Sequence, residues 1–118
     1  MTIPPGKLDL KIYQGAALEE NFAVTDSDGA LMDFTGYSAR AQAREEYESA
    51  SPFMDLTTGN GGITLGGAAG TIALYMSAAA TAAITATGGY WDLELVPPNG
   101  RVIRILQGEV CVSKEVTR

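Results

Sequence analysis

Residues 26–44 read DSDGALMDFTGYSARAQAR, and this stretch decides the fold class. It begins with turn chemistry at residues 26–29, because Asp side chains bond to the local backbone and Gly29 accepts a positive φ angle. A short apolar segment follows, and a second turn at Thr35 and Gly36 leads into residues 37–45. That last segment alternates strictly, which predicts a β-strand with two unlike faces. One face holds Tyr37, Ala39, Ala41 and Ala43, and the other holds Arg40, Gln42 and Arg44.

Alanine is not a favoured strand residue. A run of alanines on one face therefore indicates that something approaches this strand closely. Two partners fit at this stage, the second sheet of the same domain or another subunit.

Short strands bounded by turn residues continue in both directions from this stretch. Residues 7–13 place Leu8, Leu10 and Ile12 on one face, and residues 18–25 contribute Phe22 and Val24. Apolar segments at 53–56, 63–65 and 71–76 follow, and residues 90–96 turn Trp91, Leu93 and Leu95 to one side. The sequence PPNG at 97–100 predicts a hairpin in which Asn-Gly supplies positive φ angles, with residues 101–107 as the partner strand.

Two further features shape the carboxyl half. Ser77 is a good N-cap, so residues 78–84 are predicted as one short helix that Gly88 and Gly89 end. Gly108 is interpreted as a β-bulge that shifts the register and sends Val110 and Val112 inward.

These elements predict an all-β fold, an antiparallel immunoglobulin-like β-sandwich of seven to nine short strands with one short helix at 78–84. The length of 118 residues fits one domain. We expect an extended N-terminal arm at 1–6, the sandwich at 7–113 and a C-terminal tail at 114–118.

The composition excludes several classes of function. A net charge of −6 and a pI near 4.4, with scattered Lys and Arg, argue against nucleic-acid binding. The Ala-rich run at 68–86 is interrupted by Thr and Ser, so no membrane span is expected, and no secretory signal is recognised at the N-terminus.

No catalytic, cofactor-binding or metal-binding residues are assigned. The chain has no histidine and one cysteine, so Cys/His zinc sites and histidine-based nucleophilic catalysis are excluded. Cys111 lies in the apolar segment EVCVS and is interpreted as a small buried hydrophobe, and it requires no oxidising compartment. The adjacent pairs Glu19-Glu20 and Glu45-Glu46 point to opposite strand faces, so they do not converge as an acid–base pair.

Two motifs invite ligand hypotheses that the spacing disfavours. Asp26, Asp28 and Asp33 resemble the start of a calcium loop, but the twelfth position holds Tyr37 in place of the bidentate Glu. A plain turn is preferred. Residues 59–70 are Gly-rich without the Lys-Ser/Thr ending of a phosphate loop, and we interpret them as a flexible loop.

Trp91 is expected in the core, and Tyr90 is placed like the tyrosine corner of immunoglobulin-like domains.

The order of motifs resembles that of small β-sandwich domains of tailed-phage virion proteins. The similar segments are IYQGAALEENFAV, a DG turn, DFTGY at 33–37 leading into SARAQAR, GYWDLEL at 89–95, and the final strand VIRILQGEVCVS. The resemblance is greatest to the N-terminal domain of phage baseplate upper proteins and to short tail-associated proteins. This sequence ends directly after the sandwich, where the baseplate upper proteins continue into a stalk.

The resemblance implies a structural virion component, made in the host cytoplasm, that docks onto other phage proteins as a multi-copy or homo-oligomeric component, without a nucleic-acid or membrane partner, and is not an enzyme. The first hypothesis is a tail, baseplate or tail-fibre adaptor; capsid decoration and a non-viral interaction domain remain alternatives. Candidate contact elements are residues 2–6, 45–52, 59–70 and 114–118.

Overall fold

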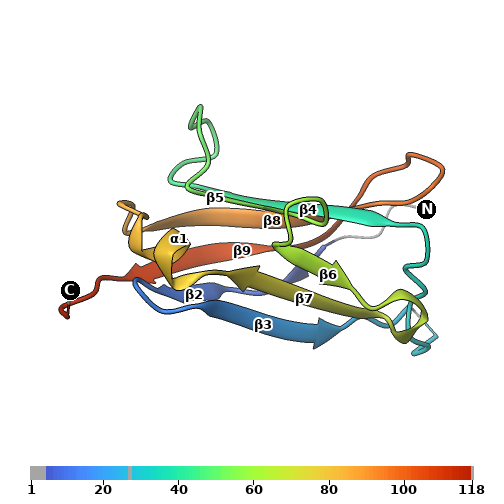
Figure 1. Cartoon of the computed structure of the whole chain (residues 1–118). Coiled ribbons are helices and arrows are strands. Elements are labelled where there is room, and N and C mark those ends of the chain that lie inside the picture. The colour runs from blue at the N-terminus through green and yellow to red at the C-terminus, as the bar shows by residue number, and fades with distance from the viewer. Residues whose placement is uncertain (1–4, 27, 118) are drawn as a thin grey trace.

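The computed structural model of the chain describes residues 5–26 and 28–117. Two β-sheets form the two layers of a sandwich (Figure 1). The six-stranded sheet has the order β1-β9-β8-β4-β5, and β2 also pairs with β9; the three-stranded sheet has the order β3-β7-β6. The larger sheet comprises β1 (Gly6–Lys7), β2 (Leu10–Tyr13), β4 (Ser38–Arg44), β5 (Met54–Thr57), β8 (Gly88–Val96) and β9 (Ile103–Ser113). The smaller comprises β3 (Leu18–Ala23), β6 (Ile63–Leu65) and β7 (Thr71–Met76), and two short helical segments are η1 (Gly67–Ala69) and α1 (Ala78–Ala82).

The strand order is that of an immunoglobulin-like sandwich. Strands β3, β7 and β6 take the places of B, E and D, while β9, β8 and β4 take those of G, F and C. The predicted all-β sandwich is confirmed. The pairing is antiparallel within both sheets except that β1 and β2 run parallel to β9.

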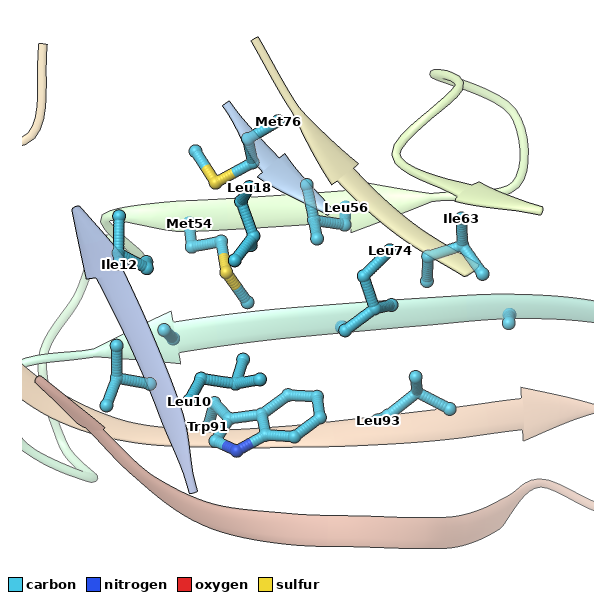
Figure 2. Close-up of a cluster of buried hydrophobic side chains, with 14 of the residues drawn as sticks. Leu10, Ile12, Leu18, Met54, Leu56, Ile63, Leu74, Met76, Trp91 and Leu93 are labelled. Atoms are coloured by element: carbon cyan, nitrogen blue, oxygen red, sulfur yellow. The ribbon is translucent and has the colours of Figure 1, made fainter. Parts of the chain in front are cut away.

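The core lies between the two sheets, where the inward residues of each strand meet (Figure 2). Trp91, Leu93 and Leu95 of β8 are buried, as are Ile72 and Leu74 of β7 on the opposite layer. The alternation predicted for β4 is confirmed, since its three alanines are buried and its arginines point outward. Contacts between β4 and β6 show that the surface approaching the alanine face is the second sheet. Small side chains at these positions let the layers pack closely without voids.

The predicted single strand at 7–13 is divided into β1 and β2 by a break at Leu8 and Asp9. The N–H of Leu8 donates to the carbonyl of Gln107. A continuous parallel ladder would return the N–H of Glu109 to the carbonyl of Leu8. Instead, Glu109 donates to the Asp9 carboxylate at 3.0 Å, and the indole N–H of Trp91 donates to the Leu8 carbonyl at 2.7 Å. The N–H and carbonyl of Leu8 and the N–H of Glu109 thus all keep a partner.

Gly108 makes this arrangement possible, although it is not the predicted bulge. The register shift in the β8–β9 pair lies between Leu93 and Glu94, which leaves Ile105 of β9 as the extra residue. A Cβ on Gly108 would lie 2.2 Å from the Leu8 carbonyl oxygen, so the glycine is required for close approach of that backbone. The predicted consequence still holds, because Val110 and Val112 are buried.

Cys111 is exposed, and its interpretation as a buried hydrophobe is wrong. Once the two valines on either side point inward, the period of two forces the residue between them outward.

The hairpin between β8 and β9 also differs in detail from its prediction. The N–H of Gly100 donates to the carbonyl of Pro97, and Gly100 has a φ of +76°, whereas every described non-Gly residue has a negative φ. Asn99 therefore does not supply a positive φ angle. Its side chain accepts a hydrogen bond from the N–H of Arg101 instead.

The helix is confirmed but ends earlier than predicted, at Ala82. The Ser77 hydroxyl accepts from the N–H of Ala80, as expected of an N-cap. Thr81 is fully buried; its hydroxyl accepts from the N–H of Gly15 and donates to the carbonyl of Ala16, which ties α1 to the β2–β3 turn. Gly88 and Gly89 do not end the helix, because they begin β8. A Cβ on Gly89 would lie 2.0 Å from the carbonyl oxygen of Arg44, so this end of β8 needs glycine for close packing.

The predicted arm and the segment 59–70 have other boundaries, while β9 ends at Ser113, before the tail at 114–118. The arm at 1–6 lies outside the described residues except for its last two, and Gly6 already belongs to β1. The segment 59–70 is not one flexible loop, since it contains β6 with buried Ile63 and the 3₁₀ turn η1. The tail is attached at its start, where Lys114 donates to the carbonyl of Thr85; residue 118 lies outside the described part.

Candidate functional site

The outer face of the six-stranded sheet, on the side away from the second layer, is the broadest organised polar surface in the described part of the chain. Alternation along β4, β8 and β9 directs one residue in two to this side. Its members are charged, amide or tyrosine side chains. We name it the outer face and define it by Lys7, Asp9, Lys11, Arg40, Gln42, Arg44, Asp55, Tyr90, Asp92, Glu94, Arg104, Gln107 and Glu109.

The outer face has no net charge. It takes five of the eight basic residues and five of the fourteen acidic residues of the sequence. The remaining three basic and nine acidic residues carry the entire net charge of −6. The surface elsewhere is therefore strongly acidic, whereas this one face mixes both signs in equal number.

Ion pairs link neighbouring strands across the face. Arg40 of β4 and Glu94 of β8 lie opposite each other in register, and Arg40 Nε donates to Glu94 Oε1 at 2.7 Å. Arg104 of β9 approaches Asp92 of β8 at 3.5 Å. These pairs are partly exposed, so each contributes little to stability. They fix the side chains in a basic row on β4 beside an acidic row on β8.

Partial burial raises the pKa of Asp92 above its ordinary value, and the nearby Glu94 carboxylate adds to this. The guanidinium of Arg104, with smaller effects from Arg40 and Arg44, acts in the opposite direction. Loss of hydration on partial burial is the larger effect, although the Asp92 side chain remains 40% exposed.

A tyrosine stack stands at one end of the face. The ring of Tyr47, from the β4–β5 loop, lies parallel to that of Tyr90 with ring centres 4.4 Å apart. Arg44 holds this loop, since one guanidinium nitrogen donates to the Ser49 carbonyl and another to Gln42 Oε1. Tyr47 remains 77% exposed, so an aromatic surface is fixed in place beside a groove of about 590 Å³ that runs along β8 and β9. Figure 1 shows this loop extending past the ends of β4 and β5, at the same end of the sandwich as α1.

The tyrosine-corner interpretation of Tyr90 is replaced by this stack. Tyr90 does stand near the start of the strand equivalent to F, as in immunoglobulin-like domains. Among the hydrogen bonds of the described residues, however, none joins its hydroxyl to a backbone group. Its ring serves as the support for Tyr47.

Open edges of the sheets are blocked, so they compete poorly with the outer face as contact surfaces. On β5, the Asn60 side chain bonds to two backbone groups, the N–H of Thr57 at 2.9 Å and the carbonyl of Asp55 at 3.1 Å. On β3, Glu20 alternates with the core residues Leu18 and Phe22 yet is exposed. A charge on the core-facing side of an edge strand opposes the addition of another strand.

The acidic turn residues show no geometry of a metal site. Asp26 Oδ1 accepts from the N–H groups of Asp28 and Ala30, and Asp33 Oδ1 accepts from the N–H and hydroxyl of Thr35. The hydroxyl of Thr35, followed by its N–H, lowers the pKa of Asp33. These carboxylates shape their own turns, which agrees with the preferred interpretation as plain turns.

Within residues 5–26 and 28–117, no group of three or more His, Cys, Asp or Glu side chains is arranged to hold a metal ion. The same residues contain no helix long and apolar enough to cross a membrane. The tyrosine stack and the neutral balance of the outer face were missed by sequence reasoning. The only signal in the sequence was the two tyrosines themselves. Tyr47 lies between acidic residues, and Tyr90 lies at the start of a predicted strand.

No protein-family model matches the chain, and no curated protein is significantly similar to it.

Proposed function

We propose that the protein is a structural component of a tailed-phage virion, a tail, baseplate or tail-fibre adaptor that acts by docking onto other proteins. The observation that carries the proposal is the combination of an immunoglobulin-like sandwich with a broad, ordered, charge-balanced outer face. The arginines of this face, Arg40, Arg44 and Arg104, and its tyrosine, Tyr90, are of the residue types enriched in protein interfaces. The groups on the face bond to one another and support recognition more readily than proton transfer.

The motifs that carry the resemblance lie in the turn before β4 and in a central strand of the larger sheet. The segment DFTGY forms a turn in which Phe34 is buried and Gly36 takes a φ of +80° before β4 begins. The segment GYWDLEL forms most of β8, the strand between β4 and β9.

Purified particles of the phage that encodes the chain provide the test. Antibody-labelled copies imaged by electron microscopy are expected at the tail or baseplate, with the small copy number of a ring. Labelling of the head with hundreds of copies would replace the adaptor proposal by capsid decoration. Absence of the protein from particles would contradict a virion role altogether.

A further inference from the structure

We infer that the outer face binds a second copy of this chain, in a symmetric dimer whose two-fold axis runs between β4 and β8 and parallel to them. The inference stands on the charge and shape of the face alone. It is tested in solution with purified protein, so its outcome is independent of the proposed virion role.

Charge distribution selects the outer face for self-association. Two copies that meet through any other surface bring together parts of a molecule whose net charge of −6 lies outside this face. Like charges held together oppose association. The outer face presents equal numbers of both signs, so contacts within it bring no net repulsion; the carboxylates of Glu45, Glu46 and Glu48, in the loop that holds Tyr47, lie beside it.

The arrangement of rows selects the symmetry. A two-fold axis makes the same patch meet itself, so the patch must be self-complementary. An axis in the plane of contact and across the strands would place the arginine row of β4 against itself. An axis parallel to the strands, between β4 and β8, places β4 over β8 of the other copy, twice, so that Arg40 faces Glu94, Gln42 faces Asp92 and Arg44 faces Tyr90. Arg40 then faces Glu94 of its own chain and of the second copy.

The size of the face fits a weak dimer. With the axis between β4 and β8, only the four strands β9, β8, β4 and β5 overlap between the two copies; at about 4.8 Å spacing, with nine residues of β8 at about 3.4 Å each, the overlap is at most roughly 19 by 30 Å. The corresponding area, at most about 600 Å² per partner, lies below the roughly 800 Å² of a standard interface and at the low end of specific interfaces. Tyr47, exposed and held by its stack on Tyr90, supplies the kind of rigid aromatic anchor that dominates binding energy.

Sedimentation velocity over a concentration series tests the dimer. The expected result is a monomer–dimer equilibrium in which Tyr47→Ala raises the Kd by about tenfold or more. Tyr75→Ala is the matched control, because Tyr75 is also an exposed tyrosine but lies on β7 of the other sheet. A wild-type protein that stays monomeric at about 1 mM, or a dimer that Tyr75→Ala weakens and Tyr47→Ala does not, would overturn the inference.

A charge-reversal pair tests the symmetry itself. Arg40→Glu and Glu94→Arg are each expected to abolish the homodimer, since each brings four like charges together at the axis. An equimolar mixture of the two variants is expected to form a heterodimer, because every facing pair is then of opposite sign. Circular dichroism of each variant checks that it is folded. Failure of two folded variants to associate when mixed, while the wild type dimerises, would refute this axis.

Discussion

Replacing Gly108 by alanine is expected to destabilise the protein through the break between β1 and β2. The new methyl carbon would lie 2.2 Å from the Leu8 carbonyl oxygen and 2.9 Å from Asp9 Oδ1, against 3.4 Å for ordinary contact. Both contacts involve the segment that must approach β9 here, so that segment has to move by about 1 Å or more. Movement on this scale breaks the hydrogen bonds that hold it.

The magnitude follows from which groups lose their partners. Trp91 is buried, so its indole N–H, left without the Leu8 carbonyl, costs about 1–3 kcal/mol. The bonds from Leu8 to Gln107 and from Glu109 to Asp9 lie nearer to water, and their loss costs about 0.5–1 kcal/mol each. The expected loss is about 2–5 kcal/mol, a large part of the roughly 5–15 kcal/mol that stabilises a domain of this kind.

Urea denaturation followed by circular dichroism measures this loss, and Gly59→Ala is the matched control. Gly59 has no positive φ angle, and a Cβ there would meet only Thr57 Oγ1, at 3.7 Å. The control is expected to change the free energy of unfolding by less than about 1 kcal/mol. If the two alanine variants are equally stable, the close approach of Leu8 to Gly108 does not exist as described.

A double-mutant cycle with Trp91→Phe shows whether the cost passes through the Leu8 carbonyl. The phenylalanine variant keeps an aromatic ring and loses the indole N–H. When Gly108→Ala has already displaced Leu8, the second substitution is expected to cost less than it does alone, by about 0.5–2 kcal/mol. Additive losses, within about 0.5 kcal/mol, would refute the shared mechanism.

Three further predictions concern the β5 edge, the helix attachment and titration. Asn60→Ala frees two backbone groups of β5, so we expect a loss of about 1–2 kcal/mol and faster aggregation in light scattering, with neither seen for Gly59→Ala. Thr81→Val keeps the shape of the side chain but leaves the N–H of Gly15 and the carbonyl of Ala16 unpaired; a loss of about 1–3 kcal/mol is expected in urea denaturation, and Thr81→Ser should recover most of it. The raised pKa of Asp92 means that the folded state binds this proton more tightly than the unfolded chain, so ionisation lowers stability as pH rises above about 4. Asp92→Asn should therefore be more stable than the wild type at pH 7 but not at about pH 3, and the opposite dependence would contradict the burial of this carboxyl.

The sandwich could be predicted from the sequence because a period of two is a local property. Alternation identifies the buried face of β4 by Ala39, Ala41 and Ala43, and that of β8 by Trp91, Leu93 and Leu95. Neither assignment requires knowledge of which strands are neighbours. The turn at Gly36 is equally local, since its positive φ angle depends on one residue. Strands and turns that depend on residues close together in the sequence were therefore predicted with the correct secondary-structure type.

The division at Leu8 could not be predicted because its cause lies elsewhere in the chain. Residues 7–13 alternate as well as any continuous strand. The break depends on an indole from β8, 83 positions away, that takes the Leu8 carbonyl, and on a glycine in β9 that admits the backbone. Gly108 was singled out correctly and explained wrongly for the same reason: sequence shows that a side chain is absent, but not which atoms fill the space.

The outer face shows the same limit at the level of the site. Strand periodicity predicted correctly that Arg40, Gln42 and Arg44 point outward. Which acids lie beside them depends on strand order, and β8, which follows β4 by more than forty residues, is the neighbour that supplies Glu94. Periodicity assigns residues to a face, whereas pairing decides what the face recognises.

The edges of the sheets and the outer face differ in the mode of docking that they favour. Backbone pairing with a partner strand needs an open edge, and each edge of the two sheets disfavours it. The Asn60 side chain bonds to the backbone of β5, and Glu20 places a charge on the core-facing side of β3. The break at Leu8 interrupts β1 and β2, and β6 has only three residues. Side-chain docking needs a broad ordered face, and the outer face provides one with fixed ion pairs and a supported tyrosine. A partner that binds this domain should therefore respond strongly to Tyr47→Ala and Arg40→Glu and weakly to substitutions along β3. Binding that survives both changes but fails on replacement of exposed β3 residues would show that strand addition operates in spite of the guarded edge.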